Sequence, residues 1–120
     1  MSYSNGIQSS YTITGVDFTS TAASDLTIAG PAGKTGRITG ISCVLTTGVT
    51  VAASSVLVGT AADTDAYATL AVPVTAIGGI LSSYTDGGIE RLPADTAVVI
   101  GNGGGATAGV GNVTVNIEWS

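Results

Sequence analysis

Short runs of β-branched and small apolar residues, cut by Gly, Pro, Asn or Asp about every ten residues, constrain this fold more than any other feature. The spacing is typical of all-β sandwiches and barrels, in which each run forms a strand and each cut forms a turn. No stretch of the sequence shows the 3.6-residue apolar periodicity of an amphipathic helix. We therefore expect an all-β fold with less than about 10% helix.

The last predicted strand, residues 113–119, shows the clearest alternation of apolar and polar side chains. Because successive side chains of a strand point to opposite faces, its apolar residues share one face. These residues are Val113, Val115, Ile117 and Trp119. We expect this face to pack against the core or against another subunit.

Further segments have the composition of strands. They are residues 10–18, 25–29, 36–46, 49–51 together with 55–59, 67–72, 79–84 and 96–101. About eight antiparallel strands most often form a double-sheet jelly roll. At 120 residues the chain has the size of one domain. We predict an N-terminal arm at residues 1–9 and a single-domain antiparallel β-sandwich of the jelly-roll type at residues 10–120.

Three local features refine this prediction. The apolar alternation slips near Gly40, which indicates a β-bulge there. Pro73 cannot donate to a strand ladder, so we expect it to end its strand or to lie at an edge. The glycine-rich residues 101–111 predict a hairpin loop before the final strand.

The residue types needed for catalysis are scarce in this chain. It has no histidine, one cysteine, three basic and eight acidic residues, with a formal net charge of −5. The acidic balance argues against nucleic-acid binding, which depends on Lys and Arg neutralising phosphates, and for the same reason against an anionic membrane surface. Without histidine, a serine nucleophile lacks its usual base and a tetrahedral zinc site lacks ligands. We predict no catalytic residue, no cofactor and no metal site, and conclude that the protein is not an enzyme.

Two sequence motifs can be interpreted either as functional sites or as ordinary structural segments. Gly33-Lys34-Thr35 matches the end of a phosphate-binding loop, but Ile28 stands where that loop requires glycine. We interpret the segment as a turn before a strand. Cys43 lies within an apolar run with no basic neighbour, which predicts a small buried side chain and not a reactive thiol.

Asp63 and Asp65 form an acidic pair in a predicted loop. Calcium takes six to eight oxygen ligands, so this pair alone is too small a donor set. Asp86 or Glu90 could add a carboxylate after folding. Whether the loop binds a cation or is simply hydrated stays open at the level of the sequence.

The low charge content predicts that part of the surface is covered in an oligomer. Only 9% of the residues are charged, against about 25% in ordinary soluble domains. We expect an apolar subunit interface, with Trp119 as one candidate contact residue. Tyr3 and Ile7 are candidate anchors through which the arm at residues 1–9 would reach a partner or a neighbouring copy.

The C-terminal quarter carries a family resemblance. Its residues read Arg-Leu-Pro-Ala-Asp-Thr from Arg91, followed by a Gly/Ala/Thr-rich loop and the alternating strand Val-Thr-Val-Asn-Ile-Glu-Trp. Together with residues 38–60, this stretch resembles small virion proteins of tailed bacteriophages. It is most similar to the capsid decoration, or cement, proteins, which are jelly-roll modules on the outer face of the shell.

The resemblance implies a non-enzymatic structural protein that decorates and stabilises a phage capsid. The implied partners are the major capsid protein and further copies of the chain, with a trimer favoured, and the implied location is the outer surface of the virion after synthesis in the host cytoplasm. The alternative is a tail or fibre module for host recognition or carbohydrate binding, which would present exposed aromatic residues at its loop tips.

Overall fold

The computed structural model describes residues 7–84 and 91–120, and the side chains of residues 7, 22–24, 83–84 and 91 are left aside. The described chain contains strands and no helix, so no helix there could cross a membrane. The strands are β1 (Ile7–Asp17), β2 (Ala22–Ile28), β3 (Gly36–Thr50), β4 (Ser54–Gly59), β5 (Ala68–Val72), β6 (Ile80–Tyr84), β7 (Arg91–Leu92), β8 (Val98–Asn102) and β9 (Ala108–Trp119).

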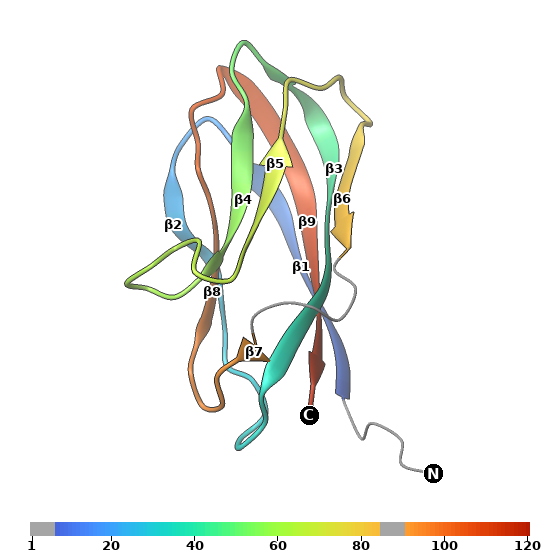
Figure 1. Ribbon diagram of the computed structural model, residues 1–120. Helices are drawn as coiled ribbons and strands as arrows, with labels where there is room; N and C mark the ends of the chain where they lie inside the picture. Colours follow the sequence, from blue (N-terminus) through green and yellow to red (C-terminus); the bar gives the residue numbers. More distant parts are fainter. Residues whose placement is uncertain (1–6, 85–90) are drawn as a thin grey trace.

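These strands form two antiparallel sheets that lie face to face, as in a β-sandwich (Figure 1). One sheet has the order β1-β9-β3-β6, with the two-residue strand β7 also paired to β3. The other has the order β2-β8-β4-β5. The pairs β1·β9, β2·β8, β3·β6 and β4·β5 are therefore nested around the β4–β5 connection.

The core lies between the two sheets and is built from the inward-facing side chains of both. The alternation predicted for the last strand is confirmed, because Val113, Val115, Ile117 and Trp119 are each at most 1% exposed. Trp119 fits because two glycines lie against its ring. A Cβ added at Gly30 would lie 2.5 Å from the ring, and one at Gly36 would lie 2.7 Å from it.

Several local predictions agree with the structure. The pairing of β3 with β9 shifts register between Ile38 and Gly40, which is the expected bulge. β5 ends at Val72, directly before Pro73. Cys43 is fully buried. Each of these features was predicted from residues that are close together in the sequence.

Other boundaries differ from the predictions. β1 begins at Ile7, so residues 7–9, which were expected in the arm, pair with β9 instead. The segments 36–46 and 49–51 belong largely to one 15-residue strand, β3, which reaches Thr50. The strand β7 was not predicted, because two residues are too few to show an alternation of apolar and polar side chains.

The predicted hairpin at residues 101–111 is wrong. β8 pairs with β2 and β4 in one sheet, whereas β9 pairs with β1 and β3 in the other. The glycine-rich segment between them crosses from sheet to sheet. Its backbone is held by bonds from Gly103 N to Ser55 O, from Ala106 N to Phe18 O and from Thr107 N to Thr50 O. Local glycine content indicated a turn but could not show which strands the turn connects.

Candidate interaction surfaces

The described residues offer little chemistry of the catalytic or metal-binding kind. Among them, no group of three His, Cys, Asp or Glu side chains could hold a metal ion. Asp63 and Asp65 are both exposed in the β4–β5 connection. Asp63 belongs to a turn in which its carbonyl accepts bonds from the backbone of Thr60 and Ala66. Asp86 and Glu90, the possible further ligands, lie outside the described residues.

The two other motifs have structural roles. Burial raises the pKa of the Cys43 thiol to about 11, because desolvation disfavours the thiolate, so the group is unreactive at neutral pH. Lys34 follows a turn in which Gly33 has a φ of 73° and the Lys34 amide bonds to Pro31 O. Strand β3, and not a helix, starts directly after this turn at Gly36, so the arrangement required for a phosphate-binding loop is missing.

Of the three residues predicted to make partner contacts, Trp119 lies in the core of the single chain. It is 1% exposed, and its indole N–H donates a hydrogen bond to the Tyr11 hydroxyl at 3.2 Å. Of the two expected locations for Trp119, the core and a subunit interface, the structure shows the core. The backbone of Ile7 pairs with Trp119. Tyr3 lies outside the described residues, so its anchoring role stays a prediction.

The outer surface of the five-stranded sheet along β1 and β9, here called the polar face, satisfies its own hydrogen bonds. Across β1 and β9, Ser10 Oγ donates to Asn116 Oδ1 at 2.6 Å, and the hydroxyls of Thr12 and Thr114 lie 3.0 Å apart. Further along, Glu118 Oε2 accepts a hydrogen bond from Gln8 Nε2 at 2.7 Å and forms an ion pair with Arg37 Nη2 at 3.3 Å. The exposed side chains of this surface are therefore polar, and they are paired with each other across neighbouring strands.

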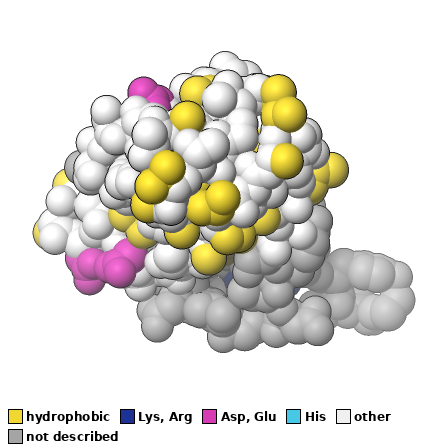
Figure 2. All heavy atoms as spheres, turned by 90° about the horizontal axis from the view of Figure 1, so that it is seen from above, with side chains coloured by type: hydrophobic (Ala, Val, Ile, Leu, Met, Phe, Trp, Pro, Cys, Tyr) yellow, Lys and Arg dark blue, Asp and Glu magenta, His cyan; other side chains and the backbone are white. Residues whose placement is uncertain are grey.

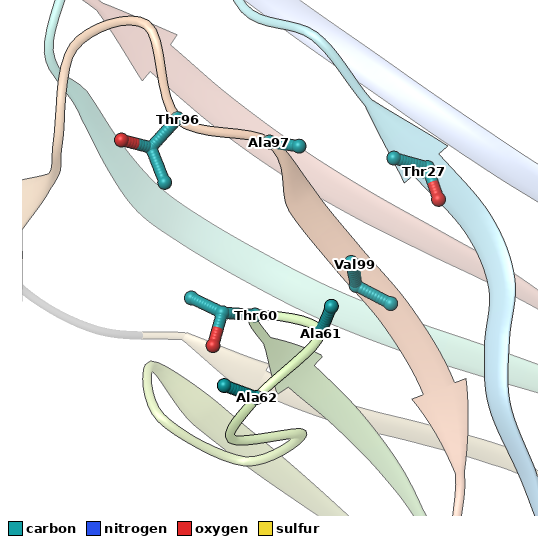
Figure 3. Close-up of a pocket in the computed structure, with 7 residues that line it drawn as sticks. All are labelled: Thr27, Thr60, Ala61, Ala62, Thr96, Ala97 and Val99. Atoms are coloured by element: carbon teal, nitrogen blue, oxygen red, sulfur yellow. The ribbon is translucent and has the colours of Figure 1, made fainter.

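The outer surface of the four-stranded sheet carries a shallow hollow of about 470 Å³ with an uncharged lining (Figure 3). The residues that line it are all small: Thr27, Thr60, Ala61, Ala62, Thr96, Ala97 and Val99. The hydroxyl of Thr60 is engaged with the backbone of Asp63, and that of Thr96 bonds to Ala94 O. The volume would suit a small molecule, but the lining lacks the convergent polar groups that select one.

A third surface is apolar; it lies at one end of the sandwich and extends onto the outer side of β3 and β6. Large hydrophobic side chains are exposed there, in β3, in β6 and in the β3–β4 and β5–β6 connections. They are Val44 (41% exposed), Val51 (80%), Val74 (57%), Ile77 (70%) and Ile80 (71%), and together they are called the apolar end. Both connections lie opposite the C-terminus (Figure 1). Figure 2 looks down on this end and shows hydrophobic side chains spread over it, with acidic groups near its outline.

The apolar end is a fixed structure. Val49 and Thr75 exchange two backbone hydrogen bonds, of 2.8 and 3.1 Å, which tie the β5–β6 connection to β3. Leu45 makes two more, to Gly78 and Gly79, at 2.8 and 3.0 Å. The exposed side chains therefore project from a braced frame, and their positions relative to each other are set by the fold.

Val51, at the tip of the β3–β4 turn, is strained as well as exposed. Its φ is 69°, in the left-handed region that β-branched residues avoid. Such a backbone conformation costs about 1–2 kcal/mol. Glycine would remove the strain together with the exposed apolar side chain. Val51 thus combines a strained backbone with the highest exposed fraction among the large hydrophobic side chains that the structure describes.

The sequence reasoning did not single out these residues, although one signal was available. Residues 38–62 and 66–85 contain no charged residue. Folding brings these two tracts together as β3, β4, β5 and β6. The charge-free tracts thus become one side and one end of the sandwich.

Comparisons of the chain with protein-family models, with curated proteins and with solved structures find no match.

Proposed function

We propose that the two sheets form a sandwich of the jelly-roll type. In a jelly roll, a long antiparallel hairpin of eight strands is rolled up, so that its first strand pairs with its eighth, its second with its seventh, and so on. Without the short β7, the described residues form eight strands, and their nested pairs β1·β9, β2·β8, β3·β6 and β4·β5 follow this order. The cross-pairs β3·β9 and β4·β8 then join the rolled hairpin into two four-stranded layers.

The proposed function is that of a non-enzymatic virion protein that decorates and stabilises the outer surface of a phage capsid. Its partners would be the major capsid protein and other copies of the chain, with a trimer favoured. The observation that carries the proposal is the braced apolar end on a chain whose described residues hold no catalytic or metal-binding cluster. Such a molecule can act through surface complementarity alone. The resemblance of residues 91–119 to phage decoration proteins supplies the kind of partner.

The physical mechanism is mass action. A module that binds the assembled shell but not its dissociated subunits stabilises the shell in proportion to its binding free energy. At a free concentration one hundred times the dissociation constant, each occupied site contributes about 2.7 kcal/mol. A dense β-sandwich suits this role, because a rigid surface loses little conformational entropy when it binds.

The alternative is a tail or fibre module for host recognition or carbohydrate binding. Sugar-binding surfaces depend on exposed aromatic rings. Among the aromatic side chains that the structure describes, Phe18 and Trp119 are buried, and Tyr11 and Tyr67 pack half-buried against the core. Nothing in the described surface therefore favours this alternative.

The proposal can be tested first by the position of the gene in its genome and then by binding to assembled capsid shells. We expect the gene to neighbour that of a major capsid protein, and we expect purified chain to co-sediment with shells assembled from that protein and to raise their melting temperature. An unrelated acidic β-sandwich protein of similar size serves as the control. Failure to bind mature shells, together with binding to host cells or glycans, would replace this function with the alternative.

A further inference from the structure

We infer that the apolar end is a self-association surface, and that its occupant is the apolar end of a second copy of this chain. The inference concerns the purified protein and does not depend on the virion assignment. Three observations carry it: the area of exposed apolar surface, the distribution of charge over the fold, and the braced but strained geometry of the surface.

The area suffices for a specific contact. The five side chains of the apolar end expose on the order of 500 Å² in one copy, so a contact that covered all of them in two copies would bury about 1,000 Å² in total, which is the lower bound for a specific interface. The largest apolar patch on a typical monomer is about 300–600 Å² and is often functional. Exposed alanines at positions 52, 53 and 76 extend the same surface.

The charge distribution selects a second copy over a charged partner. The chain carries a formal net charge of −5, so two copies repel each other over most of their surface. The apolar end draws its residues from the charge-free tracts 38–62 and 66–85. The acidic residue at that end of the five-stranded sheet, Asp17, aligns with Val110 of β9, which in turn aligns with Thr47 of β3. It therefore stands two strands from β3.

An uncharged surface also has nothing with which to recognise a basic or acidic partner. Two identical apolar surfaces, by contrast, can cover each other without any charge to pair. The apolar end itself thus carries no charged residue that would repel another copy.

The geometry favours a preformed contact. The backbone bonds of Val49 with Thr75, and of Leu45 with Gly78 and Gly79, hold the surface in place before binding. Little ordering entropy is then lost on association. The strain at Val51 places a branched apolar side chain at the tip of the surface, where a partner can cover it.

The experiment is sedimentation velocity of the purified full chain over a range of concentrations. Ile77→Asp puts a charge into the apolar end at an exposed loop position. The matched control, Thr69→Asp, puts the same charge on the exposed outer surface of the four-stranded sheet. We expect the wild type and Thr69→Asp to associate alike, and Ile77→Asp to weaken association at least about tenfold. Circular dichroism shows whether each variant keeps the β fold.

Two results would overturn the inference. One is a wild type that stays monomeric at high micromolar concentration, and the other is an Ile77→Asp variant that associates like the wild type. If the wild type is monomeric and Ile77→Asp loses binding to shells, the apolar end faces the shell and not a second copy. If association is confirmed but shells are not bound, the self-association stands and the virion function fails.

Discussion

The polar face and the apolar end differ in how their side chains are satisfied, although both lie on the same five-stranded sheet or its connections. On the polar face, pairs such as Ser10 with Asn116 and Thr12 with Thr114 bond to each other across β1 and β9. At the apolar end, Val51 and Ile77 are 80% and 70% exposed, with no cover from the described residues. Polar side chains on one surface are thus paired within the chain, whereas apolar side chains on the other are left uncovered by it.

The largest effect is expected on the two sides of β9, the strand whose outer side forms part of the polar face. Ile117→Ala should lower the free energy of unfolding by about 2–5 kcal/mol, because it opens a cavity at a fully buried site. Asn116→Ala, one residue away on the outer side, should cost less than about 1 kcal/mol. Chemical denaturation of both variants measures the difference. A loss below about 1 kcal/mol for Ile117→Ala would mean that this register is wrong.

The second effect concerns the strain at the apolar end. Val51→Gly should raise the stability of the monomer by about 1 kcal/mol, since glycine adopts a φ of 69° without steric cost. It should at the same time weaken self-association, because the apolar side chain is removed. Denaturation at low protein concentration and sedimentation at high concentration separate the two effects.

The matched control for this prediction is Ala53→Gly in the same turn, where φ is not positive. There glycine should lower stability by some tenths of a kcal/mol, because it adds freedom to the unfolded chain. Equal effects of the two glycine variants would show that Val51 stores no strain.

A third prediction converts part of the polar face into an apolar surface. The double variant Thr12→Val with Thr114→Val removes both partners of one hydrogen bond and keeps the side-chain shape. Stability should change by less than about 1 kcal/mol, since no buried group loses its partner. Sedimentation should then detect association through a surface that the wild type keeps solvated. An unchanged sedimentation profile would mean that polarity of this face is not what keeps it free.

The smallest effect is expected from pH at the rim of the apolar end. The amide and hydroxyl of Thr19 bond to Asp17 at 2.9 and 2.7 Å, and these bonds, the hydroxyl first, lower the pKa of the exposed carboxyl. Because the folded pKa is depressed, the stabilisation is present above the unfolded pKa of about 3.9 and is lost as pH falls through the folded value. Melting temperatures measured from about pH 5 downwards should fall more for the wild type than for Asp17→Asn. Parallel curves would assign the acid sensitivity to other carboxyls.

Much of the local structure could be read from the sequence, for reasons visible at single residues. Gly40 marks a bulge because it interrupts a period of two, and Pro73 ends β5 because it has no amide proton to donate. The burial of Trp119 followed from its place in an alternating strand. Its packing did not, because it depends on Gly30 and Gly36, which are distant in sequence.

The candidate site was harder to predict. Val51 and Ile77 lie in connections, where no period indicates whether a side chain is covered. Val44 and Ile80 align across β3 and β6, which are far apart along the chain. Their common exposure became visible once the sheets were assembled. The absence of charge in residues 38–62 and 66–85 was a signal, but without the fold it does not say that the two tracts meet.

By itself, the sequence determined that the chain forms strands, where many of them bend or end, and which side of β9 is buried. These properties depend on side-chain periodicity and backbone chemistry within a few residues. The tertiary structure decided that β8 and β9 belong to different sheets and that Val44 of β3 and Ile80 of β6 lie side by side. Strand pairing joins residues up to about a hundred positions apart, as in Ser10 with Asn116, and is chosen by the packing of the whole core. No local pattern contains that information.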